Sequence, residues 1–134
     1  MKIGYTTGVF DLFHVGHLNI IQTAKKQCDF LIVGVSTDEL VALEKKVSTT
    51  IPFQDRIKIV EAIKWVDQVV AQTSYNKMDA WKLYNFSKIY VGDDWRYTAR
   101  WLELENQFKY VGVEVVYLPY TKHVSSTILR SKLF

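Results

Sequence analysis

The sequence predicts an α/β fold: a doubly wound parallel sheet of about five strands with helices on both faces. Three observations predict it. Short apolar runs alternate along the chain with longer amphipathic stretches, which is the pattern of parallel strands joined by crossover helices. The run over residues 30–36 is nearly all apolar, as expected for a strand covered on both faces. Hydrophobic residues make up 49% of the 134 residues, which suits one domain over residues 1–134.

The first part of the chain starts with a strand over residues 2–9, which is short and apolar. A helix over residues 16–27 follows, because apolar side chains recur there at helical spacing. The apolar run described above is the second strand. Residues 37–51 are then expected to form a polar connection.

Later elements continue the alternation. Pro52 suits the first turn of a helix, which is predicted over residues 53–65. The further strands are predicted over residues 68–71, 88–91 and 113–118, and the further helices over residues 77–86, 99–108 and 125–134. A Rossmann-like sheet of this kind binds ligands beyond the carboxyl ends of its strands. We therefore expect the polar segments that follow the strands to meet in one site.

Composition limits the classes of partner. The net charge of +3 allows a small polyanion such as a nucleoside triphosphate but is too low to indicate nucleic acid. Cys28 is the only cysteine, so no internal disulfide is possible. The N-terminus does not resemble a signal peptide, and no apolar run approaches the length of a membrane span. We expect a cytoplasmic protein with no nucleic-acid or membrane partner.

The segment GVFDLFHVGH at residues 8–17 is the most informative motif. It joins the first strand to the first helix, where unpaired N–H groups favour an anion. His14 and His17 are three residues apart and share one helix face, and Gly16 removes a side chain that would block a phosphate. We predict a phosphate site here. The alternatives are a pair of metal ligands or two ordinary loop histidines.

Other polar residues near the predicted strand ends have a functional and a structural interpretation. Asp11 is expected to orient the motif loop by accepting backbone N–H groups. Lys45 and Lys46 either close over phosphates or form a solvated pair. Arg56 opposes the dipole of its helix, which indicates a ligand or an acidic partner, with a surface arginine as the alternative.

Two segments near later strand ends complete the candidates. Asp93 and Asp94 are adjacent and should point in opposite directions, so we assign one to structure and one to a ligand. Ser125, Ser126 and Thr127 precede the last predicted helix. Their hydroxyls can cap that helix, and the same hydroxyls with free N–H groups can form a second anion site.

Together these motifs resemble the cytidylyltransferase family of HxGH nucleotidyltransferases over nearly the whole chain. The resemblance rests on GVFDLFHVGH at 8–17, VSTDEL at 35–40, Asp55 and Arg56 followed by WVDQVV at 65–70, VGDDW at 91–95, and VVYLP followed by VSST at 124–127. It implies a homodimer that transfers a cytidylyl group from CTP to an alcohol phosphate and releases pyrophosphate, usually with Mg²⁺. The GDDW element favours glycerol-3-phosphate as acceptor and CDP-glycerol, an activated precursor of a cell-surface polymer, as product.

The resemblance also implies roles for individual residues. The expected nucleotide-binding residues are Val9, Phe10, Gly16, Asp94, Tyr120, Thr121, Lys122, Ser125, Ser126 and Thr127. The expected catalytic residues are His14, His17, Lys46 and Arg56. Lys45 and Lys77 would approach the alcohol phosphate, and Asp11 and Asp38 would orient loops. No metal ligand is expected from the protein, since Mg²⁺ would be carried by the CTP phosphates.

The sequence departs from the family near its C-terminus. Tyr120 and His123 stand where the family has an arginine and a glycine. A tyrosine cannot make the charged bidentate contact of an arginine, so we hypothesise that Lys122 or His123 supplies the missing charge. The alternative functions are transfer to another polyol or amino-alcohol phosphate, adenylyl transfer, and nucleotide binding without turnover.

Overall fold

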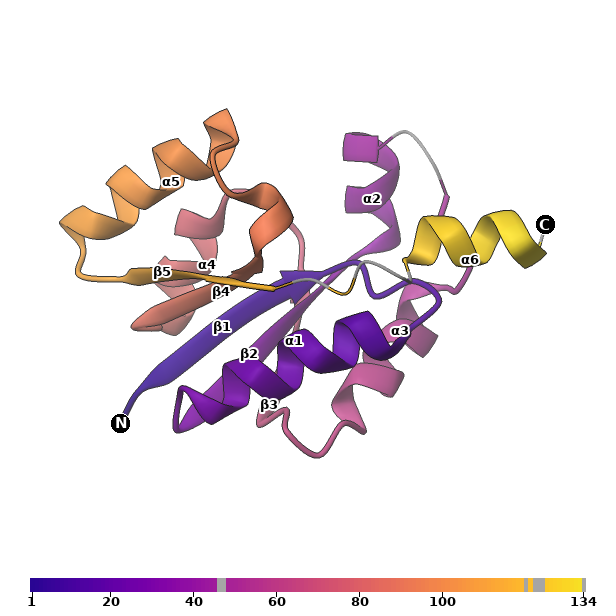
Figure 1. Cartoon of the computed structure of the whole chain (residues 1–134), viewed down its shortest axis with the longest axis horizontal. Helices are drawn as coiled ribbons and strands as arrows, with labels where there is room; N and C mark the ends of the chain where they lie inside the picture. The colour runs from indigo at the N-terminus through magenta and orange to yellow at the C-terminus, as the bar shows by residue number, and fades with distance from the viewer. Residues whose placement is uncertain (46–47, 120, 122–124, 134) are drawn as a thin grey trace.

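A parallel sheet in the order β3-β2-β1-β4-β5 runs through the molecule (Figure 1). The structure is a computed structural model, and it describes residues 1–45, 48–119, 121 and 125–133. Its strands are β1 (Ile3–Gly8), β2 (Phe30–Ser36), β3 (Gln68–Gln72), β4 (Lys88–Gly92) and β5 (Glu114–Leu118). All four pairings are parallel. The predicted α/β fold with about five strands is confirmed.

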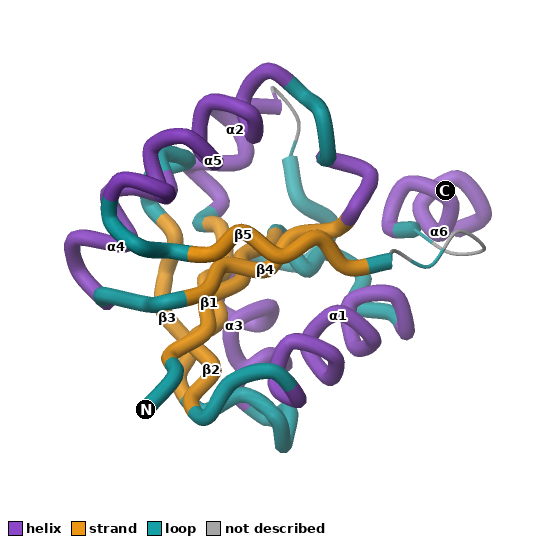
Figure 2. Tube along the Cα trace, turned by 60° about the vertical axis from the view of Figure 1, so that its left-hand side comes forward, coloured by secondary structure: helices purple, strands orange, loops and turns teal. Residues whose placement is uncertain are grey.

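Helices cover both faces of the sheet. They are α1 (Val15–Lys26), α2 (Asp38–Lys45), α3 (Phe53–Glu61), α4 (Lys77–Tyr84), α5 (Ala99–Tyr110) and α6 (Ser126–Leu133), with a short 3-10 helix η1 (Asp93–Trp95). Helices α1 and α3 pack on one face, and α4 and α5 pack on the other (Figure 2). The sheet is therefore doubly wound. The start of β1 lies far from α6, the last helix of the chain (Figure 1).

The interior strand β2 shows why its sequence is almost entirely apolar. Leu31, Val33 and Val35 are buried in the core under α1 and α3. Ile32 belongs to the core on the other face, with Phe108 of α5. Because successive side chains of a strand point to opposite faces, a strand covered on both sides needs apolar residues at every position.

Helix α2 corrects the prediction of a polar connection over residues 37–51. Its first turn is capped by Thr37, whose hydroxyl oxygen accepts from the backbone N–H of Leu40 at 3.2 Å. Acidic residues in the first turn and Lys45 in the last turn suit the helix dipole. Leu40 and Val41 are buried. The helix has only eight residues and its apolar positions, residues 40–43, are consecutive, so the stretch is too short to show a helical period. The helix predicted over residues 53–65 also ends earlier, at Glu61.

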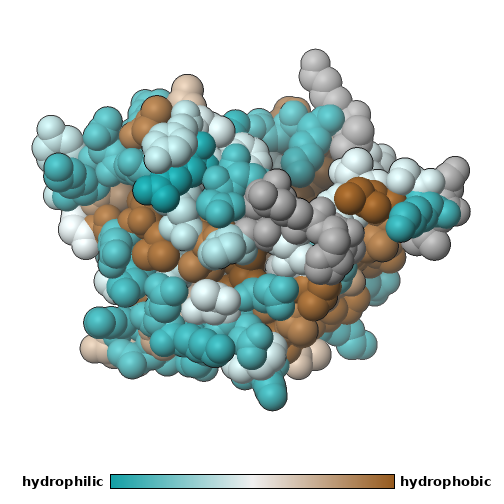
Figure 3. All heavy atoms as spheres, in the orientation of Figure 1, coloured by the Kyte–Doolittle hydropathy of each residue, from teal (hydrophilic) through white to brown (hydrophobic). Residues whose placement is uncertain are grey.

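The surface is mostly hydrophilic on the face drawn in Figure 3. Hydrophobic side chains come to the surface where the N-terminal turn of α1 approaches α6 (Figure 3), and exposed Val15 and Ile128 belong to these two helices. Across the described part of the chain, no helix is long and apolar enough to cross a membrane.

Candidate functional site

The segments that follow the strands meet at the carboxyl edge of the sheet. Helix α2, the loop from β1 to α1 and the start of α6 all lie there (Figure 1). This edge contains a cavity of about 400 Å³ and a second cavity of about 220 Å³. Val9 and Lys45 line both, so the two cavities adjoin at these residues. The parallel topology thus brings the sequence motifs together, as expected.

His14 and His17 cap the first turn of α1 reciprocally. Nδ1 of His14 accepts from the backbone N–H of Gly16 at 3.0 Å, and Nδ1 of His17 accepts from the backbone N–H of His14 at 3.2 Å. The two rings stack with centroids 3.9 Å apart. An Nδ1 that accepts a hydrogen bond carries no proton, so each neutral ring carries its proton on Nε2. Both Nε2–H groups can then donate to an anion.

Both imidazoles are neutral at neutral pH. Burial lowers the pKa of His14. Burial, together with the neighbouring His14, lowers the pKa of His17 to about 3. In the part of the chain that the structure describes, no group of three or more His, Cys, Asp or Glu side chains is placed to hold a metal ion. The pair is arranged as hydrogen-bond donors.

The absence of a side chain at Gly16 makes room for the ring of His14. A Cβ at this position would lie 2.8 Å from Cε1 and 2.9 Å from Nδ1 of His14. The preceding loop is strained, since Phe10 and Leu12 have φ values of 56° and 50°. Such backbone conformations cost about 1–3 kcal/mol each and persist only where surrounding contacts impose them.

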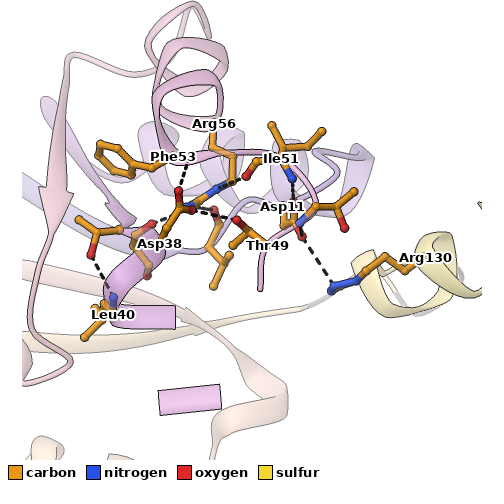
Figure 4. A network of polar contacts seen from close by, with 12 residues as sticks. Asp11, Asp38, Leu40, Thr49, Ile51, Phe53, Arg56 and Arg130 are labelled. Carbon is orange, nitrogen blue, oxygen red and sulfur yellow. Dashed lines mark hydrogen bonds and ion pairs between the residues drawn. The ribbon is translucent and has the colours of Figure 1, made fainter. Parts of the chain in front are cut away.

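Asp11 supplies part of that restraint (Figure 4). Its buried carboxylate accepts from the backbone N–H groups of Thr50 and Ile51 at 2.9 Å and 2.8 Å. These contacts join the motif loop to the segment before α3. They are the loop-orienting bonds expected for Asp11.

Arg56 is fully buried, with 0% exposure, so the surface-arginine alternative is wrong. Its Nη1 donates to the carbonyl oxygens of Val9 at 2.6 Å and Ser36 at 2.8 Å. Its Nε donates to the carbonyl of Ile51 at 2.9 Å, and its Nη2 pairs with Asp38 at 2.6 Å (Figure 4). The ends of β1 and β2 are thus tied to α3. Arg56 thus holds these segments in position, has the acidic partner that the sequence allowed, and lines neither cavity. Its expected place among the catalytic residues stays a prediction.

Asp38 completes this network. Besides Arg56, it accepts from the hydroxyl of Thr49 at 2.8 Å and from the backbone N–H of Phe53 at 3.1 Å. Desolvation raises the pKa of the Asp38 carboxyl, but the bonds from Phe53, Arg56 and Thr49 outweigh it and hold the pKa below its usual value. Asp38 therefore stays ionised and orients the segment before α3, the role expected for it.

The smaller cavity lies between the histidine motif and α6. Phe10, His17, Ser126, Thr127 and Arg130 are among the residues that line it. Ser125 caps α6 by accepting from the backbone N–H of Ile128 at 3.0 Å, and the Ser126 hydroxyl donates to the carbonyl of Asp11. The helix-cap interpretation is therefore observed for Ser125.

Arg130 is a residue that sequence reasoning missed. Its Nη1 lies 3.7 Å from Oδ2 of Asp11 (Figure 4). Its side chain also lines the smaller cavity. Ser126 and Arg130 are four residues apart on α6, so they share a helix face. That spacing was a signal the sequence did contain.

Besides Lys45, the larger cavity has two cationic side chains at its walls, Lys77 and Arg100. Lys77 is 8% exposed, and its Nζ donates to Oε1 of Gln72 at 3.0 Å. Burial lowers the pKa of Lys77 to about 8, and the nearby charge of Arg100 contributes in the same direction. Tyr75, Glu44 and Arg100 also line this cavity and were not identified from the sequence. No motif marked them, because they come from three separate elements.

Some predicted residues line neither cavity, and others lie outside the described residues. Asp94 is exposed in η1, and partial burial raises the pKa of its carboxyl. Thr121 accepts from Nδ2 of Asn19 on α1 at 3.0 Å. Three predicted site residues, together with His123 from the charge hypothesis, lie outside the described residues: Lys46, Tyr120 and Lys122.

Comparison with known proteins agrees with this geometry. Residues 5–132 match the family described as cytidylyltransferase-like. A glycerol-3-phosphate cytidylyltransferase of Bacillus subtilis (strain 168) is 34% identical over 137 residues, covering 99% of this chain and 98% of the relative. An FAD synthase of Thermococcus kodakarensis is 33% identical over 114 residues, covering 84% of this chain and 76% of the relative. The crystal structure of a lipopolysaccharide core biosynthesis protein from Thermoplasma volcanium has a TM-score of 0.75 at 24% identity, covering 91% of this chain and 98% of that one, and supports the fold.

Proposed function

This chain belongs to the cytidylyltransferase-like family of nucleotidyltransferases, and we propose that it transfers the cytidylyl group of CTP to glycerol-3-phosphate, giving CDP-glycerol and pyrophosphate. The acceptor follows from the full-length similarity to the Bacillus subtilis glycerol-3-phosphate cytidylyltransferase. The observation that carries the mechanism is the pair of cavities that adjoin at Val9 and Lys45. Two anionic substrates bound in adjoining cavities can bring their phosphates together.

The chemistry needs no covalent nucleophile. An oxygen of the acceptor phosphate attacks the α-phosphorus of CTP, and the new P–O bond forms as the bond to the β-phosphate oxygen breaks. Pyrophosphate leaves with that electron pair. A phosphomonoester has a second pKa of about 6, so its attacking oxygen is already ionised near neutral pH. The protein has to place two anions in line and offset the charge that develops on pyrophosphate.

Each cavity suits one of the two substrates. In the smaller cavity, the Nε2–H of His17, the hydroxyls of Ser126 and Thr127, and Arg130 are suited to the triphosphate. His14 would donate beside His17 from the same helix start. Lys45 lies where the cavities adjoin and is suited to neutralise the phosphates of both substrates. Lys77 and Arg100 in the larger cavity suit the acceptor.

We propose that Mg²⁺ arrives with CTP, bound by its phosphate oxygens, and that it neutralises part of their charge. The described residues do not group as a resident metal site, so no step is assigned to a protein-bound ion. We further propose that the enzyme works in the cytoplasm as a homodimer. Sedimentation equilibrium of the purified protein tests the dimer, and a monomer at micromolar concentration would contradict it.

Pyrophosphate release tests the function. The purified protein is mixed with Mg²⁺, with CTP or ATP, and with glycerol-3-phosphate or one of several other alcohol phosphates. We expect turnover with CTP and glycerol-3-phosphate, with CDP-glycerol as the second product. Turnover with ATP and an acceptor, but not with CTP, would show adenylyl transfer instead of cytidylyl transfer. CTP binding without turnover of any acceptor would make the protein a nucleotide binder and overturn the proposal.

A further inference from the structure

Two cationic side chains in the larger cavity share one aromatic ring. Nζ of Lys77 lies 5.3 Å from the ring centroid of Tyr75, and Cζ of Arg100 lies 5.8 Å from the same centroid. Lys77 begins α4 and Arg100 lies in the first turn of α5. Two helix starts on the same face of the sheet therefore bring two positive charges to one wall of the cavity.

Lys77 is a buried cation whose observed partner is neutral. Its Nζ donates to the amide oxygen of Gln72, and none of the ion pairs among the described residues includes Lys77. The amide of Gln72 is itself bound to the hydroxyl of Ser36 at 2.9 Å. A buried ammonium is costly unless it is paired. An anion in the cavity would supply the missing counter-charge for Lys77.

Arg100 has one carboxylate partner at the cavity. Its Nη2 lies 2.7 Å from Oε1 of Glu44, the residue before Lys45 on α2. A guanidinium has five N–H donors, so Arg100 can hold Glu44 and a phosphate together. With Glu44 engaged in this way, no uncompensated carboxylate among the described lining residues is left to attract an ammonium group.

The neutral part of the cavity offers groups that bind hydroxyls. Ser36, Gln72 and Tyr75 line it, and the buried hydroxyl of Tyr75 has no hydrogen-bond partner among the described residues. An unpaired buried hydroxyl costs free energy, and a ligand hydroxyl can satisfy it. Trp95 and Trp101 add apolar walls. These groups suit a small hydroxylated tail.

We propose that Arg100 is a specificity-determining residue of the acceptor site: with Lys77 it binds the acceptor phosphate, and its charge excludes acceptors with a cationic head group. The preferred acceptor is thus a phosphomonoester with a neutral, hydroxylated tail. This inference rests on the proposed transfer reaction, in which the larger cavity takes the acceptor.

Steady-state kinetics of Arg100→Ala test it. We expect the KM for glycerol-3-phosphate to rise at least tenfold while the KM for CTP changes less than threefold. The ratio of kcat/KM for glycerol-3-phosphate to that for phosphoethanolamine should fall. The matched control is Arg96→Ala, because Arg96 lies over the rings of Tyr97 and Tyr117 and does not line the cavity. Equal effects of both variants, or an unchanged KM in Arg100→Ala, would overturn the proposal.

Glu44→Gln separates phosphate binding from a merely structural ion pair. If Arg100 binds the phosphate, removal of the neighbouring negative charge lowers the KM for glycerol-3-phosphate. If Arg100 only ties α5 to α2 through Glu44, Glu44→Gln raises that KM as Arg100→Ala does, and the proposal fails.

Binding of glycerol-3-phosphate can be measured without turnover. Trp95 and Trp101 line the cavity, so glycerol-3-phosphate should change the tryptophan fluorescence of the wild-type protein. We expect the dissociation constant to rise at least tenfold in Arg100→Ala. Binding that depends on Arg100 without turnover would support the anion site and overturn the transfer reaction. Turnover with the same dissociation constant in both proteins would support the reaction and overturn the role of Arg100.

Discussion

The imidazoles of His14 and His17 stack with centroids 3.9 Å apart, while the Nδ1 of each accepts a backbone hydrogen bond at the start of α1. This arrangement fixes both neutral rings with a proton on Nε2. The same two residues therefore cap the start of α1 and present two hydrogen-bond donors where the helix dipole favours an anion.

The two roles of His14 can be separated by substitution. His14→Asn keeps a side-chain acceptor at the N-cap and loses the imidazole donor, whereas His14→Ala loses both. We expect His14→Asn to keep the free energy of unfolding within about 0.5 kcal/mol of wild type, and His14→Ala to lose about 1 kcal/mol. Both should lower kcat on the order of 100-fold, because a transition-state donor is lost. Urea unfolding and pyrophosphate release measure the two effects; normal kcat in His14→Asn would remove His14 from the chemistry.

His17 should make stability depend on pH. Its pKa is about 3 in the folded protein and near 6.5 when unfolded, so between these values the unfolded chain binds the extra proton. Stability therefore decreases as pH falls below 6.5. From pH 7 to pH 5 we expect wild type to lose about 2 kcal/mol more than His17→Asn, measured by urea unfolding at both values. Identical losses would show that His17 does not titrate in this way.

Arg56 should matter for stability more than any surface ion pair. Arg56→Met leaves the carbonyls of Val9 and Ser36 without their donor and Asp38 without its partner, so we expect a loss of about 3 kcal/mol in the free energy of unfolding. The control is Lys88→Met, which removes the partly exposed pair with Glu114 and should cost less than about 0.5 kcal/mol. Urea unfolding compares them, and similar losses would contradict the positioning role.

Deprotonation of Lys77 should lower the activity of the enzyme at alkaline pH. Its pKa of about 8 means that it loses its charge as pH rises through that value. We expect kcat/KM for glycerol-3-phosphate to fall above pH 8, and Lys77→Arg to move this limb to higher pH because a guanidinium stays charged. The profile for CTP at saturating glycerol-3-phosphate serves as the control. A limb that stays in place in Lys77→Arg would assign it to another group.

Either Arg130 or Lys122 could supply the positive charge that the family's arginine would provide at position 120. Arg130 lines the smaller cavity, and we expect Arg130→Ala to raise the KM for CTP about tenfold, by about 1.4 kcal/mol of binding. The sequence hypothesis predicts the same increase for Lys122→Ala, and an unchanged value would exclude Lys122. Exposed Lys132 on the same helix provides the control, Lys132→Ala. An unchanged KM in Arg130→Ala would exclude Arg130.

Predictions from the sequence succeeded where a residue and its partners are close in the chain. The alternation of apolar runs identified the strands of the sheet. The spacing of His14 and His17 indicated a helix start, whose capping bonds span two and three residues. Helix α2 was not predicted, also for a local reason, since its eight residues carry their apolar side chains in one consecutive run, residues 40–43, which shows no helical period.

Roles that depend on distant partners could not be predicted. Arg56 and Val9 are 47 residues apart in the chain, and Arg100 and Glu44 are 56 apart. No local pattern distinguishes a buried arginine that holds carbonyls from one that reaches a ligand. The difference depends on which segments the strand order brings together.

The sequence by itself determined the α/β class, the family and the anion-favouring start of α1, because periodicity, capping and a ten-residue motif involve neighbours in the chain. The tertiary structure alone decided that Arg56 is buried, that Arg130 lines the smaller cavity, and that Lys77 and Arg100 share the ring of Tyr75. Burial and charge pairing are properties of residues that meet only when the sheet has formed.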